Sequence, residues 1–185
     1  MKIDPPDVAR YLLLGAHAPD PALAARIDAL RTAALDVLRP ARTWRRGDLA
    51  DWCARSTTLA RRLAGCHAVY LACGTLGAGF DALARRTAAT SAADALVLQA
   101  IGAAAIEEWM DLTEDEIRRE LAPDETLVRR YSPGYGDLPL AAQRDLLGFL
   151  DAPRTVGVSL TDSLLMVPSK SVSALIGVRK VSSAT

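Results

Sequence analysis

The feature that most constrains the fold is a run of apolar residues, Ala68-Val-Tyr-Leu-Ala-Cys73, which has the length of one strand. A short, nearly continuous apolar run is typical of a strand that is buried inside a sheet. Glycines at positions 74, 77 and 79 follow at once, and then a helical pattern begins. The rest of the chain must therefore supply the elements that bury this strand.

Helical patterns dominate the chain as far as Pro123. Ser91 and Asp94 have the spacing of a capping box and open a long helix over residues 92–112. A second capping box begins at Thr113, so we expect the helix to break and restart there. Further helices are expected over residues 5–13, 21–38, 56–64, 78–86 and 139–150.

Strand patterns prevail after Pro123, over residues 126–131, 156–160, 164–167 and 172–181, and residues 43–46 favour an edge strand. This order predicts an α+β fold, with helices packed on a twisted, mainly antiparallel (mixed) β-sheet. We divide the chain into an N-terminal helical segment, residues 1–55, and an α+β core, residues 56–185, and expect both in one compact domain.

Composition excludes several classes of protein. The 185 residues include 22 basic and 22 acidic side chains, so the basic excess of a general nucleic-acid binder is absent. The longest apolar stretch, residues 92–106, contains Asp94 and Gln99, which predicts a buried helix and no membrane contact. The cysteines and the two histidines, His17 and His67, lack the spacing of a metal site. An odd cysteine count without a signal peptide predicts a cytoplasmic protein.

Two segments invite a functional interpretation. The glycines at 74, 77 and 79 match neither the dinucleotide fingerprint nor a phosphate loop, so we favour tight packing over a phosphate site. In residues 130–137, Arg-Tyr-Ser-Pro-Gly-Tyr-Gly-Asp, the turn would expose backbone amides to a ligand, and Arg130 would hold a carboxylate in a fork. Tyr135 offers an aromatic face, although an ordinary turn explains the loop equally well.

Glu107 and Asp111 share one face of the long helix, next to the small residues 102–105. A solvated acidic face is the usual reason for such charges. The small residues, however, would leave room for a ligand or a strand beside Glu107. No histidine or glutamate is placed to activate a serine, so serine nucleophile chemistry is not expected.

Three segments together carry a resemblance to a known family. They are Arg130-Tyr-Ser-Pro-Gly-Tyr-Gly-Asp-Leu-Pro-Leu140, Gly157-Val-Ser-Leu-Thr-Asp-Ser163 and Met166-Val-Pro-Ser-Lys-Ser-Val-Ser173. They resemble the activation domain of cobalamin-dependent methionine synthase, and residues 70–79 and 100–107 resemble its short, free-standing versions. The resemblance covers roughly residues 56–178.

The resemblance implies a reactivation subunit that binds S-adenosylmethionine and supports reductive methylation of cob(II)alamin on a partner. By position, Arg130 would hold the ligand's carboxylate, and Glu107 would face its amino group. Ser132, Pro133, Gly134 and Tyr135 would line the site, with no catalytic or metal-binding residue.

The cofactors implied are S-adenosylmethionine and cobalamin, the latter carried by a methionine synthase core or another corrinoid protein, because this chain lacks the cobalamin signature. A flavodoxin-type protein would donate the electron. The family's N-terminal arm and later tyrosine-bearing strand have no counterpart here, so the site is expected to be more open, weaker or completed by another chain. Two alternatives stay open: an adaptor that stabilises a corrinoid protein without S-adenosylmethionine, and, with less support, an independent methyltransferase.

Overall fold

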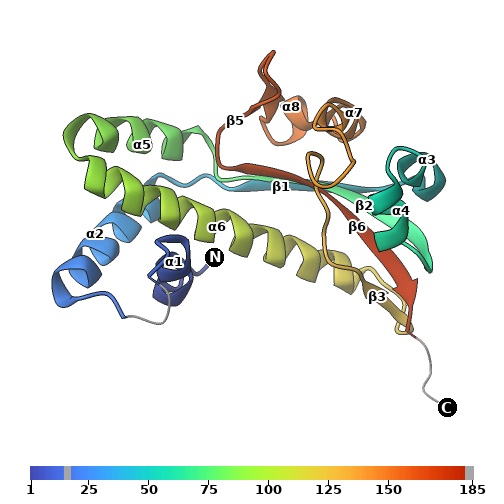
Figure 1. The fold of residues 1–185 in the computed structure, drawn as a ribbon, viewed down its shortest axis with the longest axis horizontal. Helices are drawn as coiled ribbons and strands as arrows, with labels where there is room; N and C mark the ends of the chain where they lie inside the picture. Colours follow the sequence, from blue (N-terminus) through green and yellow to red (C-terminus); the bar gives the residue numbers. More distant parts are fainter. Residues whose placement is uncertain (15–17, 182–185) are drawn as a thin grey trace.

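The computed structural model describes residues 1–14 and 18–181. Its helices surround one central sheet, and the longest helix crosses beneath that sheet (Figure 1). The helices are α1 (Pro5–Tyr11), α2 (Pro21–Val37), α3 (Leu49–Cys53), α4 (Thr57–Arg62), α5 (Ala78–Thr90), α6 (Ala92–Arg119), α7 (Ala142–Phe149) and α8 (Ala152–Thr155). The strands are β1 (Ala41–Gly47), β2 (Cys66–Thr75), β3 (Glu125–Leu127), β4 (Ser159–Leu160), β5 (Met166–Val167) and β6 (Ser171–Lys180).

The central sheet has the order β1-β2-β6-β3, and every neighbouring pair in it is antiparallel. This confirms the predicted α+β class. The apolar run Ala68–Cys73 lies in the inner strand β2, and the expected edge strand near residues 43–46 is β1. Because β1 belongs to the N-terminal segment, the sheet spans the proposed boundary at residue 55, and the division itself stays a prediction.

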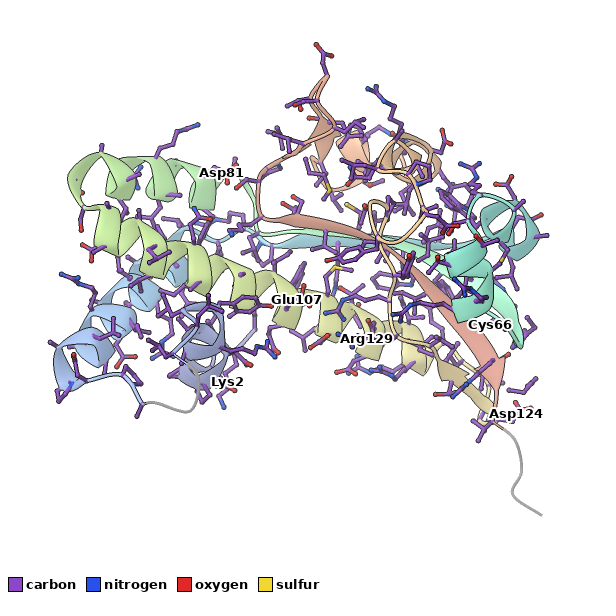
Figure 2. All side chains as sticks on the ribbon, viewed as in Figure 1. Lys2, Cys66, Asp81, Glu107, Asp124 and Arg129 are labelled. Carbon is purple, nitrogen blue, oxygen red and sulfur yellow. The ribbon has the colours of Figure 1, made fainter. Side chains whose placement is uncertain are left out.

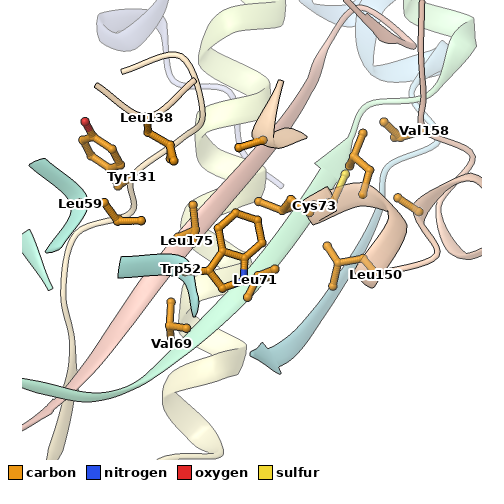
Figure 3. Close-up of a cluster of buried hydrophobic side chains, with 14 of the residues drawn as sticks. Trp52, Leu59, Val69, Leu71, Cys73, Tyr131, Leu138, Leu150, Val158 and Leu175 are labelled. Atoms are coloured by element: carbon orange, nitrogen blue, oxygen red, sulfur yellow. The ribbon is translucent and has the colours of Figure 1, made fainter. Parts of the chain in front are cut away.

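The alternation of side chains along β2 explains why both faces of the sheet are covered. Tyr70 and Ala72 point toward α6, where they pack with Met110. Leu71 and Cys73 point to the opposite face and pack in a cluster around Trp52 (Figure 3). The helices α3, α4 and α7 close that second face over the same strands. Because β2 is buried on both sides, its sequence is a continuous apolar run.

The N-terminal half of α6 lies in a separate cluster with α1, α2 and α5. Its small residues allow close packing: a Cβ at Gly102 would meet the ring of Phe80 and the Lys170 Cε atom. The space at Gly102 is filled by the protein's own side chains, whereas Glu107, beside which room for a ligand is expected, lines the cleft described below.

Several boundaries differ from the sequence prediction. The break at Thr113 is wrong, because α6 continues to Arg119 and the Thr113 hydroxyl donates to the Trp109 carbonyl at 2.8 Å. The strand expected over residues 126–131 is also wrong in length, since β3 ends at Leu127. Beyond it, Val128 donates to the Gly177 carbonyl at 2.8 Å, and an isolated bridge joins Tyr131 to Leu175. The strands expected over 156–160 and 164–167 shrink to the two-residue pair β4 and β5.

Candidate functional site

Three carboxylates on one face of α6 converge on Arg130, which lies on the segment after β3. Glu107, Asp111 and Glu114 are spaced by four and three residues, so they lie above one another along the helix. Arg130 Nη1 donates to Asp111 Oδ1 at 2.6 Å and to Glu114 Oε1 at 2.7 Å, and Nη2 donates to Glu107 Oε2. Figure 2 labels Glu107 near the middle of α6 and Arg129, the neighbour of Arg130, on the facing segment.

These three ion pairs differ in exposure, and that difference separates their roles. The side chains of Arg130 and Glu114 are 17% and 9% exposed, whereas Glu107 and Asp111 are 42% and 63% exposed. Burial opposes the charge on Arg130, but hydrogen bonds to Glu114, Asp111 and Glu107 outweigh it and hold the pKa of Arg130 above its ordinary value. Arg130 and Glu114 therefore form a buried pair, with two exchangeable carboxylates at its solvent side.

The turn that follows Arg130 is closed by its own backbone. Gly134 has a φ of 91°, a conformation that favours glycine, and its amide donates to the Leu138 carbonyl at 2.9 Å. The amide of Tyr135 donates to the Ser132 carbonyl at 3.3 Å. These two amides are engaged within the turn, so the expectation that the turn exposes its amides to a ligand is wrong for both of them.

The loop is fastened at its far end by Asp137. This carboxylate accepts hydrogen bonds from the Ser56 and Thr57 hydroxyls and from the backbone amides of Thr57 and Thr58, at 2.9 and 3.0 Å for the amides. The hydroxyl bonds from Ser56 and Thr57 hold the pKa of Asp137 well below its ordinary value. Asp137 thereby fixes the position of the loop that carries Tyr135.

A cleft of about 930 Å³ opens between α6, this loop and β6. Of the six site residues predicted from the sequence, Gly134 alone is absent from the residues lining the cleft. Tyr135 is 65% exposed, and the centroid of its ring lies 6.2 Å from that of the Tyr131 ring. The predicted residues in the lining are Glu107, Arg130, Ser132, Pro133 and Tyr135.

Other residues in the lining were not predicted as part of the site. Glu114 lies seven positions after Glu107, so helical periodicity extended by one step would have found it. Ser171 and Ser173 come from β6, and Gln143 comes from α7. These residues are too far from Glu107 and Arg130 in the sequence for a local pattern to place them in the same site. Arg10 from α1 also lines the cleft, so the N-terminal segment contributes to its wall.

The remaining sequence predictions concern packing, metals and membranes. A Cβ at Gly79 would meet the Val37 carbonyl oxygen, and one at Gly77 would lie 2.8 Å from the Arg39 carbonyl oxygen, as tight packing requires. Among the described residues, no group of histidine, cysteine or acidic side chains is arranged to hold a metal ion, and His17 lies outside those residues. No helix in residues 1–14 or 18–181 is both long and apolar enough to cross a bilayer.

Comparisons with known proteins agree with this architecture. Residues 48–183 match the family model described as "Vitamin B12 dependent methionine synthase, activation domain". Among solved structures, the chain is similar to the MetH reactivation domain in a crystal structure bound to AdoHcy, with a TM-score of 0.67 and 17% identity. The match covers 97% of this chain and 75% of that chain. A search of curated proteins finds no match.

Proposed function

The chain belongs to the family of vitamin B12-dependent methionine synthase activation domains, and we propose that it binds S-adenosylmethionine in the cleft beside Arg130. In this proposal it presents the ligand to a corrinoid protein whose cobalamin has become inactive. The bound state of the structural neighbour, which holds AdoHcy, supports this choice of ligand class. We place the reaction in the cytoplasm, where three free cysteines remain reduced.

The observation that carries the proposal is the ion pair between Arg130 and Glu107. The amino-acid end of S-adenosylmethionine has one carboxylate and one ammonium group, so a neighbouring guanidinium and carboxylate are its electrostatic complement. Among the described residues, the Nε atom of Arg130 has no hydrogen-bond partner. A ligand carboxylate would bind the Nε and Nη2 edge as Glu107 turns toward the ammonium group, while the buried Glu114 keeps Arg130 in place.

The chain's contribution would be positioning. S-adenosylmethionine supplies a methyl group on a sulfonium, the partner's corrinoid is its acceptor, and a flavodoxin-type protein is the proposed electron donor. Arg130 and Glu107 would fix one end of the ligand, and Tyr135 and Pro133 would limit its movement above the loop. Holding a reactant in one orientation lowers the entropic cost of the transfer, and no acid–base group of this chain is required.

A second candidate function is an adaptor that binds a corrinoid protein without S-adenosylmethionine. Two observations favour it: Arg130 already has three carboxylate partners, and the Gly134 and Tyr135 amides are used within their own turn. In that case the ion-pair cluster would be purely structural. The two functions differ in whether the isolated chain binds the ligand.

Calorimetric titration of the purified chain with S-adenosylmethionine separates the two functions. We expect one site per chain, and we expect Glu107→Gln to weaken binding about tenfold by removing the ammonium's partner. Glu108→Gln is the matched control, because Glu108 is outside the cleft lining. The affinity of this variant for S-adenosylmethionine should stay within about twofold of the wild-type affinity. No heat of binding at millimolar ligand would leave the adaptor as the function.

A further inference from the structure

The strand β1 forms the edge of the central sheet that lies away from the cleft. In the order β1-β2-β6-β3, β2 is its one strand neighbour within the described residues, and the ladder between them runs from Ala41 to Gly47. The cleft is lined from β3 and β6 at the other side of the sheet, and no residue of β1 belongs to its lining. A partner bound along β1 would leave the cleft open, so this inference does not depend on the proposed function.

A hydrogen bond at the end of β2 shows which backbone groups of β1 point outward. Leu76, directly after β2, donates to the carbonyl of Lys170, directly before β6, at 2.9 Å. Because backbone groups alternate between the two edges of a strand, the even-numbered residues of β2 face β6 and the odd-numbered ones face β1. The register pairs odd residues of β2 with odd residues of β1. Arg42, Trp44 and Arg46 therefore turn their N–H and C=O groups away from the sheet.

These outward backbone groups form an unpaired edge. Within residues 1–14 and 18–181, no hydrogen bond joins the backbone N–H or C=O of Arg42, Trp44 or Arg46 to another part of the protein. Alternating N–H and C=O groups along an edge are a template for one more strand, and peptide recognition commonly uses such an edge. The side chains of β1 determine which strand it can accept.

The arginines of β1 differ in whether their charge is compensated. Arg42 forms an ion pair with Glu116 on α6. Arg45 and Arg46 are exposed, and neither forms an ion pair with a carboxylate of the described residues; Arg45 donates to the Phe149 carbonyl at 3.0 Å. Adjacent residues of a strand point to opposite faces, so one uncompensated positive charge lies on each side of this edge. The edge therefore attracts a strand that carries acidic side chains.

The same arginines oppose a second copy of this chain on the edge. Antiparallel pairing of two β1 strands over their full length would place Arg42 of each copy opposite Arg46 of the other. Like charges directly opposite each other destabilise a pair of strands. An acidic strand avoids this repulsion, so charge complementarity selects a different protein as the occupant.

We propose that β1 is the docking edge for an acidic, extended segment of a partner protein, which adds to the sheet as an antiparallel strand. The partner residue opposite Trp44 would be apolar, because the half-buried Trp44 ring is its cross-strand neighbour. The two partner residues before it would be acidic, since antiparallel addition places them opposite Arg45 and Arg46. The segment recognised therefore has the order acidic, acidic, apolar.

The test titrates the intact chain with two end-blocked peptides at low ionic strength, Ser-Glu-Glu-Val-Thr-Thr-Ser and Ser-Lys-Lys-Val-Thr-Thr-Ser. We expect the glutamate peptide to bind about tenfold more tightly than the lysine peptide. The double variant Arg45→Glu with Arg46→Glu should reverse this preference. Arg85→Glu with Arg86→Glu is the matched control, because it changes two adjacent exposed arginines on α5, and it should keep the wild-type preference. Equal affinities of the two peptides for wild type would overturn the proposal.

Two methylated forms of the glutamate peptide separate strand addition from simple charge attraction. N-methylation of the valine removes the N–H that would donate to the Trp44 carbonyl, so binding should weaken about tenfold. N-methylation of the next threonine removes an N–H that points away from β1, so the affinity should change by less than about threefold. Equal effects of the two methyl groups would overturn the added strand.

The oligomeric state of the free chain completes the test. We expect a monomer in sedimentation, because the edge repels a second copy. A dimer that dissociates in the double variant Trp44→Pro with Arg46→Glu would assign the edge to a second copy and overturn the proposal. Absence of peptide binding at millimolar concentration would overturn it as well. None of these measurements uses S-adenosylmethionine, so their failure leaves the proposed function untouched.

Discussion

Replacing Arg130 by methionine should destabilise the fold, because it leaves Glu114 as a buried charge. Glu114 is 9% exposed, and removing one member of a buried pair typically costs about 3–5 kcal/mol. Arg118 still contacts Glu114 at 3.2 Å and compensates part of the charge, and the exposed Glu107 and Asp111 add little. We therefore expect Arg130→Met to lower the free energy of unfolding by about 2–3 kcal/mol.

Urea unfolding followed by tryptophan fluorescence measures this loss. The free energy of unfolding falls linearly with urea concentration, so extrapolation to zero urea gives the stability of each variant. Adding Glu114→Gln to Arg130→Met removes the orphaned charge and should restore about 1–2 kcal/mol. Arg154→Met is the matched control: its ion pair with Asp151 joins side chains that are 84% and 44% exposed, so its loss should be below about 0.5 kcal/mol. A cost for Arg130→Met equal to that of the control, or no recovery in the double variant, would refute the reasoning.

Three further predictions concern the frame around the site. Asp137→Asn should lower the urea midpoint at pH 7; because hydrogen bonds from Ser56 lower the pKa of Asp137 in the fold, the wild-type advantage should begin to shrink below about pH 4 and disappear only as the pH falls through that lowered pKa. Burial raises the pKa of the Cys73 thiol to about 12, so a thiol reagent at pH 8 should label this cysteine only after unfolding. Gly79→Ala, which helix propensity favours, should instead cost about 1–3 kcal/mol in urea unfolding, because its Cβ would meet the Val37 carbonyl oxygen. An unchanged urea midpoint for Asp137→Asn would contradict the first prediction, and labelling of Cys73 in the folded protein would contradict the second. A Gly79→Ala variant that is more stable than wild type would contradict the third.

The sequence predicted the parts of the fold that depend on local patterns. The apolar run at Ala68–Cys73 became β2, and the capping residue Ser91 starts α6, where its hydroxyl accepts from the Asp94 amide at 3.2 Å. The second capping box failed at Thr113, which is fully buried and bonds back to its own helix. There, packing of the helix on the sheet overrides a local stop signal.

The site was predicted as a set of residues but not as an arrangement. The loop pattern predicts Arg130 and the helix face predicts Glu107, and the structure brings the two into one ion pair. The buried partner Glu114 and the cleft-lining Ser173 depend on how α6 and β6 lie beside each other in the fold. Such contacts join segments far apart in the sequence, so no local pattern encodes them.

A crystal structure of the chain with S-adenosylhomocysteine tests the central claim most directly. The account predicts that the ligand's carboxylate lies within hydrogen-bond distance of Arg130 and that its ammonium group contacts Glu107, with Glu114 unmoved. A saturated crystal in which Arg130 keeps all three carboxylates and the ligand lies elsewhere would contradict it.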